Sequence, residues 1–190
     1  LGGKARGLAF MNSMLVKYCQ YAKYENVRVT IPRTVVVATD YFDAFIRNNG
    51  LEYVLTTEMT DEEILSEFVS STLPYKLREA LKAYVRTVSG PLAVRSSSKL
   101  EDSHYQPFAG IYSTYMIPYT EGNEDRQLRL LQKAIKSVYA STYFAASKAY
   151  VQSSQNLIAE EKMAVVIQEV CGTEQDGLYF PTLSGVARSI

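Results

Sequence analysis

A short apolar segment that ends in an arginine and three serines constrains this chain most. Residues 93–98 read Ala-Val-Arg-Ser-Ser-Ser and follow a Ser-Gly-Pro turn at residues 89–91, which predicts a buried strand with Arg95 at its C-terminal end. A guanidinium in that position is costly without an anionic partner, and phosphate suits it because two parallel donors match two phosphate oxygens. The alternative is an ion pair with Glu101 or Asp102 that only orders the loop after the strand.

The first residues of the chain predict a second place for an anion. Gly2 and Gly3 precede Lys4, and apolar residues then recur at steps of three and four, namely Leu8, Met11, Leu15, Cys19 and Ala22. This spacing predicts an amphipathic helix. Free backbone N–H groups at a helix N-terminus attract anions, and Lys4 adds a full positive charge. The sequence contains no Walker A motif, and a simple turn is the alternative interpretation of the glycine pair.

Helices and strands alternate along the rest of the chain, which predicts an α/β (α+β) fold. Thr39 and Gly50 are suited to begin and end one helix, and Thr60 with Glu63 matches a capping box. A kink near Ser141 would divide the last long helix in two. We expect strands over 34–38, 93–98, 112–117 and 162–170, helices over 40–49, 60–71, 74–87 and 124–149, and a turn over 172–177.

Composition excludes several classes of partner. The chain has 20 basic and 20 acidic residues, so its charge gives no reason to expect binding to nucleic acid or to an anionic membrane. No apolar run approaches the roughly 18 residues of a membrane span, and no signal peptide is present. Cys19 and Cys171 are expected to be buried free thiols. We therefore expect a soluble, cytoplasmic protein.

Three sequence blocks together resemble one known family. GGKARGLAFM at the start is similar to the GGK-x-x-x-L-x-x-M opening of the phosphoenolpyruvate synthase and pyruvate phosphate dikinase family. AVRSSSKLED followed by FAG resembles the VRSS-x-x-x-ED…FAG block of that family. The segment MAVVIQEV at 163–170 is similar to its hinge strand. The order and spacing of the three blocks span nearly the whole chain.

The resemblance implies the N-terminal portion of an ATP-grasp-like domain, in which two lobes sandwich ATP and a mixed sheet has flanking helices. Residues 1–177 would form the first part up to the hinge, and residues 178–190 the start of a second lobe. In that family a separate domain carries a phosphorylated histidine and a third binds pyruvate or phosphoenolpyruvate. The chain begins without Met, inside the glycine motif, and ends without a cap, so we expect it to be a segment of a longer protein.

Site residues follow from the same resemblance. Arg95 would be catalytic, because with Lys4 it would hold the ATP phosphates and neutralise charge during phosphoryl transfer. The sequence departs from the family at Ile111, where a Gln is expected, and at Ser113, where an acidic residue is usual. The acidic ligands of Mg²⁺ are expected beyond residue 190, so no metal ligand is assigned here. The full set expected to contact ATP is Lys4, Arg95, Gly110, Thr114 and, through backbone groups at the adenine, Gln168, Glu169 and Val170.

Three functions are compatible with these residues. The first is the ATP-binding part of a dikinase that phosphorylates a histidine elsewhere in the protein and then pyruvate, so that residues 1–190 alone have no turnover. The second is the same lobe in a phosphotransferase with another acceptor, as in antibiotic- and glucan-phosphorylating relatives. The third is a non-catalytic nucleotide-binding or regulatory module, which Ile111 favours and which Lys4 and Arg95 argue against. The single histidine, His104, does not match the family's phosphohistidine motif and is interpreted as an exposed loop residue.

Overall fold

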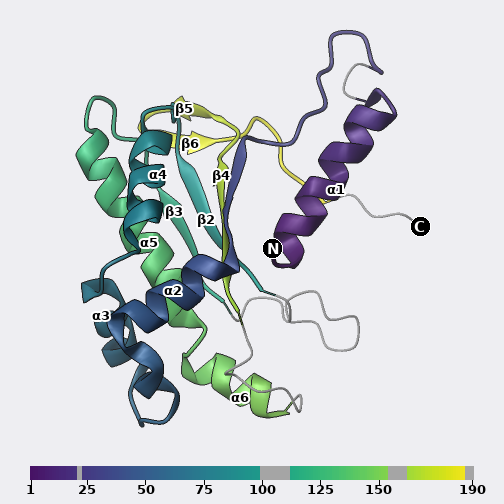
Figure 1. The fold of residues 1–190 in the computed structure, drawn as a ribbon. Coiled ribbons are helices and arrows are strands. Elements are labelled where there is room, and N and C mark those ends of the chain that lie inside the picture. Colours follow the sequence, from purple (N-terminus) through teal and green to yellow (C-terminus); the bar gives the residue numbers. More distant parts are fainter. Residues whose placement is uncertain (21–22, 99–111, 154–161, 187–190) are drawn as a thin grey trace.

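A computed structural model describes residues 1–20, 23–98, 112–153 and 162–186. In this part of the chain a four-stranded sheet has the order β1-β4-β2-β3, with β1 at Thr34–Val37, β2 at Leu92–Ser97, β3 at Thr114–Ile117 and β4 at Ala164–Glu169 (Figure 1). All neighbouring strands are antiparallel, so the expectation of a mixed sheet is wrong although the α+β class is confirmed. The reason is that β1 and β2 run in the same direction but β4 lies between them.

The helices gather mainly on one side of this sheet. Helices α2 to α5 cover one face, whereas α1 stands beside the opposite face (Figure 1). The two-helix alternative at Ser141 is confirmed, because α5 ends there and α6 follows. The helices are α1 (Gly3–Lys17), α2 (Thr39–Asn49), α3 (Asp61–Ser70), α4 (Tyr75–Val85), α5 (Glu124–Ser141) and α6 (Ala145–Ser153), with a 3-10 turn η2 (Leu51–Leu55).

Local capping explains where several helices begin and end. The capping box at α3 is confirmed: the Thr60 N–H donates to the Glu63 carboxylate at 2.8 Å, and the Glu63 N–H donates to Thr60 Oγ1 at 3.2 Å. Gly50 ends α2 in the left-handed conformation, with φ of 62°. The expected role of Thr39 is wrong, because the residue at the N-cap is Ala38 and no side chain caps that end.

The core lies between the sheet and helices α2 to α5. Every second strand residue points into it, including Val94 and Ile167, both fully buried. Aromatic rings fill the space beyond, with centroids of Phe42 and Tyr139 5.0 Å apart and those of Phe45 and Phe68 5.7 Å apart. Rings at these separations add to the stability that burial alone provides.

Helix α1 differs from the other helices because its apolar side is exposed. It ends at Lys17 and does not reach Ala22 as its spacing predicts, and only Gly3 and Ala5 within it are buried. Phe10 is 63% exposed and Val16 is 61% exposed. Cys19 and Cys171 are free, as expected, but exposed rather than buried, and Cys19 lies beyond the end of the helix. Among the described residues, no helix combines the length and apolar character needed to cross a bilayer.

Candidate functional site

The strand alternation places Arg95 on the face of the sheet away from the helical layer. Val94 points into the core, so Arg95 points to the opposite face. In the register of the sheet Arg95 lies between Thr114 on β3 and Val166 on β4. Residues directly opposite one another in antiparallel strands share a face, so these three side chains form a row on the side where α1 stands.

A second row of side chains lies two residues closer to the C-terminal end of β4. Ala93 of β2 lies between Gln168 of β4 and Met116 of β3 on that same face. The Gln168 side-chain amide donates to Thr34 Oγ1 at 3.1 Å, which fixes its orientation. Ala93 carries the smallest side chain of this row.

The N-terminus of α1 reaches the end of β2. The Lys4 ammonium lies 3.5 Å from Ser96 Oγ, although the two residues are 92 apart in sequence. Lys4 therefore lies at the same end of β2 as Arg95, one strand residue further along. Lys4 and Arg95, which come from separate motifs, thus lie near the same end of β2.

The backbone donors of this helix end are largely used by the protein itself. The Gly3 N–H donates to the Ser98 carbonyl at 2.9 Å, and the Ala5 N–H donates to Ser97 Oγ at 3.1 Å. The expectation of free N–H groups awaiting an anion is therefore wrong for these two donors, because β2 supplies acceptors that the linear sequence does not show. The Lys4 side chain, which donates to Ser96 Oγ, adds a positive charge at this helix end.

Arg95 is partly buried, and within the described ranges no hydrogen bond or ion pair involves its guanidinium. None of its five donors is used by a described residue. The rival partners Glu101 and Asp102 lie outside the described residues, as do Gly110, Ile111 and His104. Thr114 is exposed beside Arg95 and adds a hydroxyl to the same row.

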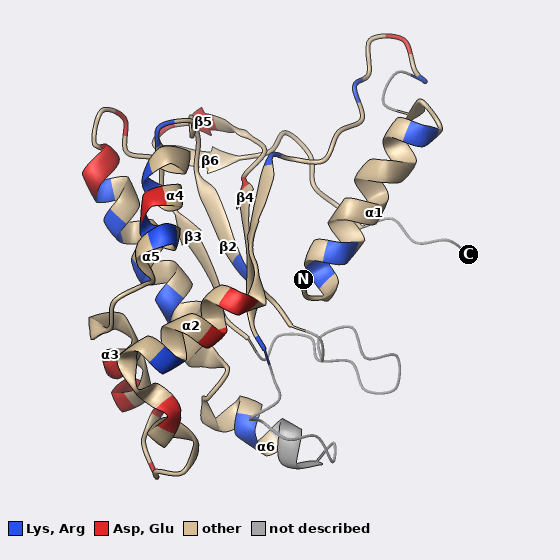
Figure 2. Ribbon diagram, in the orientation of Figure 1, with Lys and Arg blue, Asp and Glu red and all other residues tan. Residues whose placement is uncertain are grey.

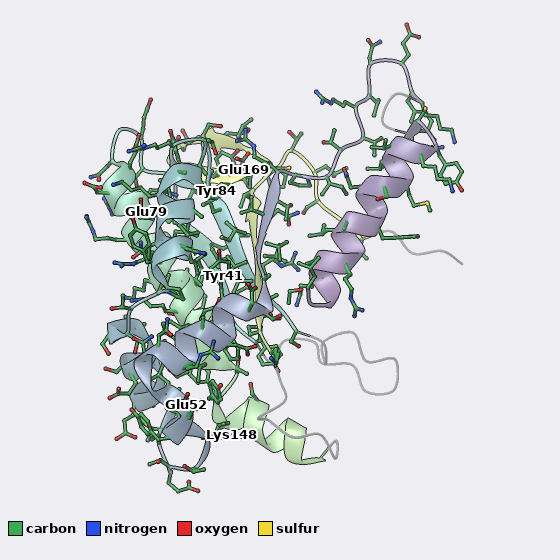
Figure 3. All side chains as sticks on the ribbon, in the orientation of Figure 1. Tyr41, Glu52, Glu79, Tyr84, Lys148 and Glu169 are labelled. Carbon is green, nitrogen blue, oxygen red and sulfur yellow. The ribbon has the colours of Figure 1, made fainter. Side chains whose placement is uncertain are left out.

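At the C-terminal end of β4, where the resemblance predicts the hinge, the side chain of Glu169 points toward the helical layer. Its carboxylate lies 3.3 Å from Arg33 Nε, and Tyr84 of α4 lies at the same end of the sheet (Figure 3). Burial, and then the Glu169 charge, raise the pKa of the Tyr84 hydroxyl to about 12. Glu169 is therefore held in place by Arg33 and is not turned toward the open face.

Two backbone N–H groups at this end of β4 already have protein partners. The Glu169 N–H donates to the Arg33 carbonyl at 2.9 Å, and the Val170 N–H donates to the Pro91 carbonyl at 2.9 Å. A ligand at this strand end would therefore meet carbonyl oxygens rather than these two N–H groups.

A hairpin that the sequence analysis missed covers the strand ends next to Val170. Strands β5 (Thr173–Gln175) and β6 (Leu178–Phe180) pair across Asp176 and Gly177, whose φ values are 52° and 77°. Positive φ at both positions is typical of a type I′ turn, so the Asp-Gly pair was the signal that could have identified it. The hairpin encloses a pocket of about 470 Å³, whose lining includes Met116, Tyr119, Val170 and Tyr179.

The charge on the two sides of the sheet differs. All charged residues of α1 are basic, namely Lys4, Arg6 and Lys17, whereas acidic residues gather on α2 and α3 (Figure 2). The charge carried by α1 itself is therefore entirely positive, which favours an anion near this helix. Among the described residues, no group of three or more His, Cys, Asp or Glu side chains is placed to hold a metal ion.

Comparison with known proteins identifies the family. Over residues 1–190 the chain matches the family model described as pyruvate phosphate dikinase, AMP/ATP-binding domain. The chain belongs to this family. It is 31% identical over 157 residues to an uncharacterized phosphotransferase of Bacillus subtilis (strain 168), YvkC, covering 79% of this chain and 17% of that protein. It is 29% identical over 202 aligned positions to a phosphoenolpyruvate synthase of Aeropyrum pernix, covering 95% of this chain and 22% of that protein. The chain thus spans less than a quarter of the length of either relative.

Proposed function

We propose that this chain is the ATP-binding portion of a phosphoenolpyruvate synthase-like dikinase, which transfers phosphate from ATP to a histidine elsewhere in the protein and on to pyruvate. The observation that carries this proposal is the Arg95 guanidinium, which has no partner among the described residues and lies at the same strand end as Lys4. Membership of an AMP/ATP-binding family supplies the ligand that two such cations suit.

The two ends of the site are separated by a distance that a nucleoside triphosphate can bridge. Val170 lies beside Pro91, four residues before Arg95, which corresponds to about 13 Å along the strand. We infer that the triphosphate lies against Arg95, Lys4 and Thr114, and that the base lies over Ala93 near Gln168. The exocyclic amine of adenine would then donate to a backbone carbonyl at Glu169 or Val170.

The chemistry of this lobe is positioning and charge neutralisation. In phosphoryl transfer the developing charge lies on phosphate oxygens, and fixed cations stabilise it. Arg95 provides two parallel donors, and Lys4 provides a point charge at the end of the strand. Gly110 of the glycine-rich turn belongs to the same proposal. A second lobe in an ATP-grasp-like arrangement would close over the nucleotide and exclude water.

Mg²⁺ belongs to this proposal only through residues outside the described part of the chain, because the described carboxylates form no cluster. The metal would neutralise charge on the triphosphate when bound. Pyruvate and phosphoenolpyruvate would likewise bind to other parts of the protein. The cytoplasmic location stays a prediction of the sequence.

A phosphotransferase with another acceptor is the second candidate. It is favoured by the identity to the Bacillus subtilis phosphotransferase, which is as high as the identity to the phosphoenolpyruvate synthase. A module that binds no nucleotide is disfavoured, because it would leave the partly buried Arg95 without an anionic partner.

Incubation of the complete protein with MgATP tests these alternatives. The proposal predicts ATP binding, an acid-labile phosphohistidine, and loss of that label when pyruvate is added. Label that forms but survives pyruvate would favour another acceptor. Absence of ATP binding to the wild-type protein would overturn both kinase proposals. Residues 1–190 alone are expected to form no phosphorylated product, because they contain no acceptor histidine motif.

A further inference from the structure

We propose that Gly2 and Ser97 are positioning residues that clamp the N-terminus of α1 onto the end of β2 and thereby hold Lys4 next to Arg95. This inference rests on the proposed function, because it assigns Lys4 to the phosphates of ATP. The inference also changes the role of the glycine pair. Because Gly2 has no side chain, a strand of the protein, rather than the ligand, can approach its backbone closely.

The contact at Gly2 has no space for a side chain. A Cβ built on Gly2 would lie 1.7 Å from the Ser97 carbonyl oxygen and 2.6 Å from Ser97 Oγ. The nearest atom is backbone within a paired strand, so it has no rotamer to move away. The backbone of Gly2, with φ of −74° and ψ of −178°, is one that any residue adopts. Gly2 is therefore required by close approach and not by its conformation.

Ser97 supplies the cap that α1 lacks in its own sequence. Gly2 occupies the N-cap position and has no side chain to accept from the first turn. Ser97 Oγ accepts the Ala5 N–H at 3.1 Å, and the Ser98 carbonyl accepts the Gly3 N–H at 2.9 Å. Both serines are completely buried. A side-chain bond at this position stabilises the start of a helix, and here it also joins two elements.

Along the rest of α1, the large apolar side chains are half-buried or exposed. Only Gly3 and Ala5 of the helix are buried, whereas Phe10, Met11 and Val16 are exposed. When the clamp is loosened, Lys4 is no longer held beside β2, while the aromatic core on the other face remains. Because phosphate binding by two cations depends on their fixed separation, affinity for ATP falls before the fold does.

Paired glycine variants in the complete protein provide the first test. Gly2→Ala meets the Ser97 carbonyl, whereas Gly7→Ala lies in the same helix with nothing within 4 Å of the added Cβ. We expect Gly2→Ala to weaken ATP binding, measured by calorimetry, about tenfold to 100-fold, which is the loss of one charge-assisted contact. Gly7→Ala is expected to leave the affinity unchanged. Equal affinities for Gly2→Ala and the wild type would overturn the clamp.

A double-mutant cycle provides the second test and remains informative if Gly2→Ala does not fold. Ser97→Ala is compared with Ser137→Ala, another buried serine whose Oγ donates only to Lys133 of its own helix. Ser97→Ala should weaken ATP binding in the wild-type background and have no further effect in the Lys4→Ala background, because it acts through Lys4. A full additional loss in that background would show a role independent of Lys4 and overturn the inference.

The same cycle separates this inference from the proposed function. If the wild-type protein binds ATP and Lys4→Ala weakens it, the proposed function holds whatever Ser97→Ala does. If Lys4→Ala has no effect on ATP affinity, the assignment of Lys4 to the phosphates fails, and the clamp loses its role in ATP binding as well.

Discussion

The two faces of the central sheet differ in what holds them in place. On one face, Phe45, Phe68 and Tyr139 are completely buried between the sheet and the helices. On the other, half-buried Arg95 lies beside exposed Thr114, and α1 is attached through its first residues (Figure 1). Under the proposed function, stability resides on the first face and ligand binding on the second. One strand, β2, contributes Val94 to the first and Arg95 to the second.

The largest expected effect on stability comes from a substitution on the core face alone. Phe45 is fully buried, with its ring centroid 5.7 Å from that of Phe68 and 5.4 Å from that of Tyr139. We expect Phe45→Ala to lower the free energy of unfolding by about 3–5 kcal/mol, measured by urea denaturation. The ATP affinity of the folded fraction should not change. A matched loss of affinity would show that the two faces are not independent.

Substitutions of Arg95 test the opposite face of the sheet, on which α1 stands. Arg95→Ala should reduce ATP affinity about tenfold to 100-fold, because charge-assisted hydrogen bonds are lost. Arg95→Lys should restore only part of it, since an ammonium makes no bidentate contact. Thermal stability should change little, because no described residue pairs with the guanidinium. The opposite pattern, a lower Tm with unchanged ATP affinity, would support the alternative in which Arg95 only orders the Glu101–Asp102 loop.

The capping box of α3 tests a smaller contribution on the core face. Thr60→Ala should cost about 1 kcal/mol of unfolding free energy and leave ATP binding unchanged. The Thr60 N–H, and then its hydroxyl, lower the pKa of the Glu63 carboxyl. A lowered pKa means that this contribution is complete above the ordinary value of 4.5 and is lost as the pH falls through the folded-state value. Thr60→Ala removes the hydroxyl donor to this carboxylate but keeps the backbone N–H. Urea titrations at pH 7 and pH 3 should therefore show a smaller Thr60→Ala effect in acid, and an equal effect would contradict a contribution from the bond between the hydroxyl and the carboxylate.

The smallest effect at neutral pH is expected at Tyr84, beside the hinge. Its pKa is raised to about 12, so the folded protein holds the phenolic proton more tightly than the unfolded chain does. The associated stability is complete below pH 10 and is lost as the pH rises toward 12. Tyr84→Phe should thus reduce the alkaline loss of stability, measured as the urea midpoint at pH 8 and pH 11. Tyr75→Phe, at a side chain that is 68% exposed, is the control and should not.

Local signals in the sequence predicted most elements correctly, because they act within a few residues. The Thr60 and Glu63 capping box, Gly50 and the division of the last long helix all depend on neighbours in the chain. The order of the strands in the sheet could not be predicted from these local signals, since the insertion of β4 between β1 and β2 depends on contacts distant in sequence.

The candidate site shows the same division. The residue types at Lys4 and Arg95 indicated phosphate chemistry, but their position at one strand end depends on the Gly2–Ser97 contact, which no local pattern encodes. The spacing of apolar residues predicted an amphipathic helix, yet within its apolar stripe Leu8 and Leu15 are only half-buried and Met11 is exposed. Periodicity predicts that a helix forms, whereas burial depends on a partner surface.

A crystal structure of the complete protein with a non-hydrolysable ATP analogue tests the central claim most directly. We predict that phosphate oxygens lie within hydrogen-bonding distance of the Arg95 guanidinium and the Lys4 ammonium. The base should lie over Ala93, on the face where α1 stands. A nucleotide bound elsewhere, for example in the pocket beneath the β5–β6 hairpin, with Arg95 paired only to protein groups, would contradict it.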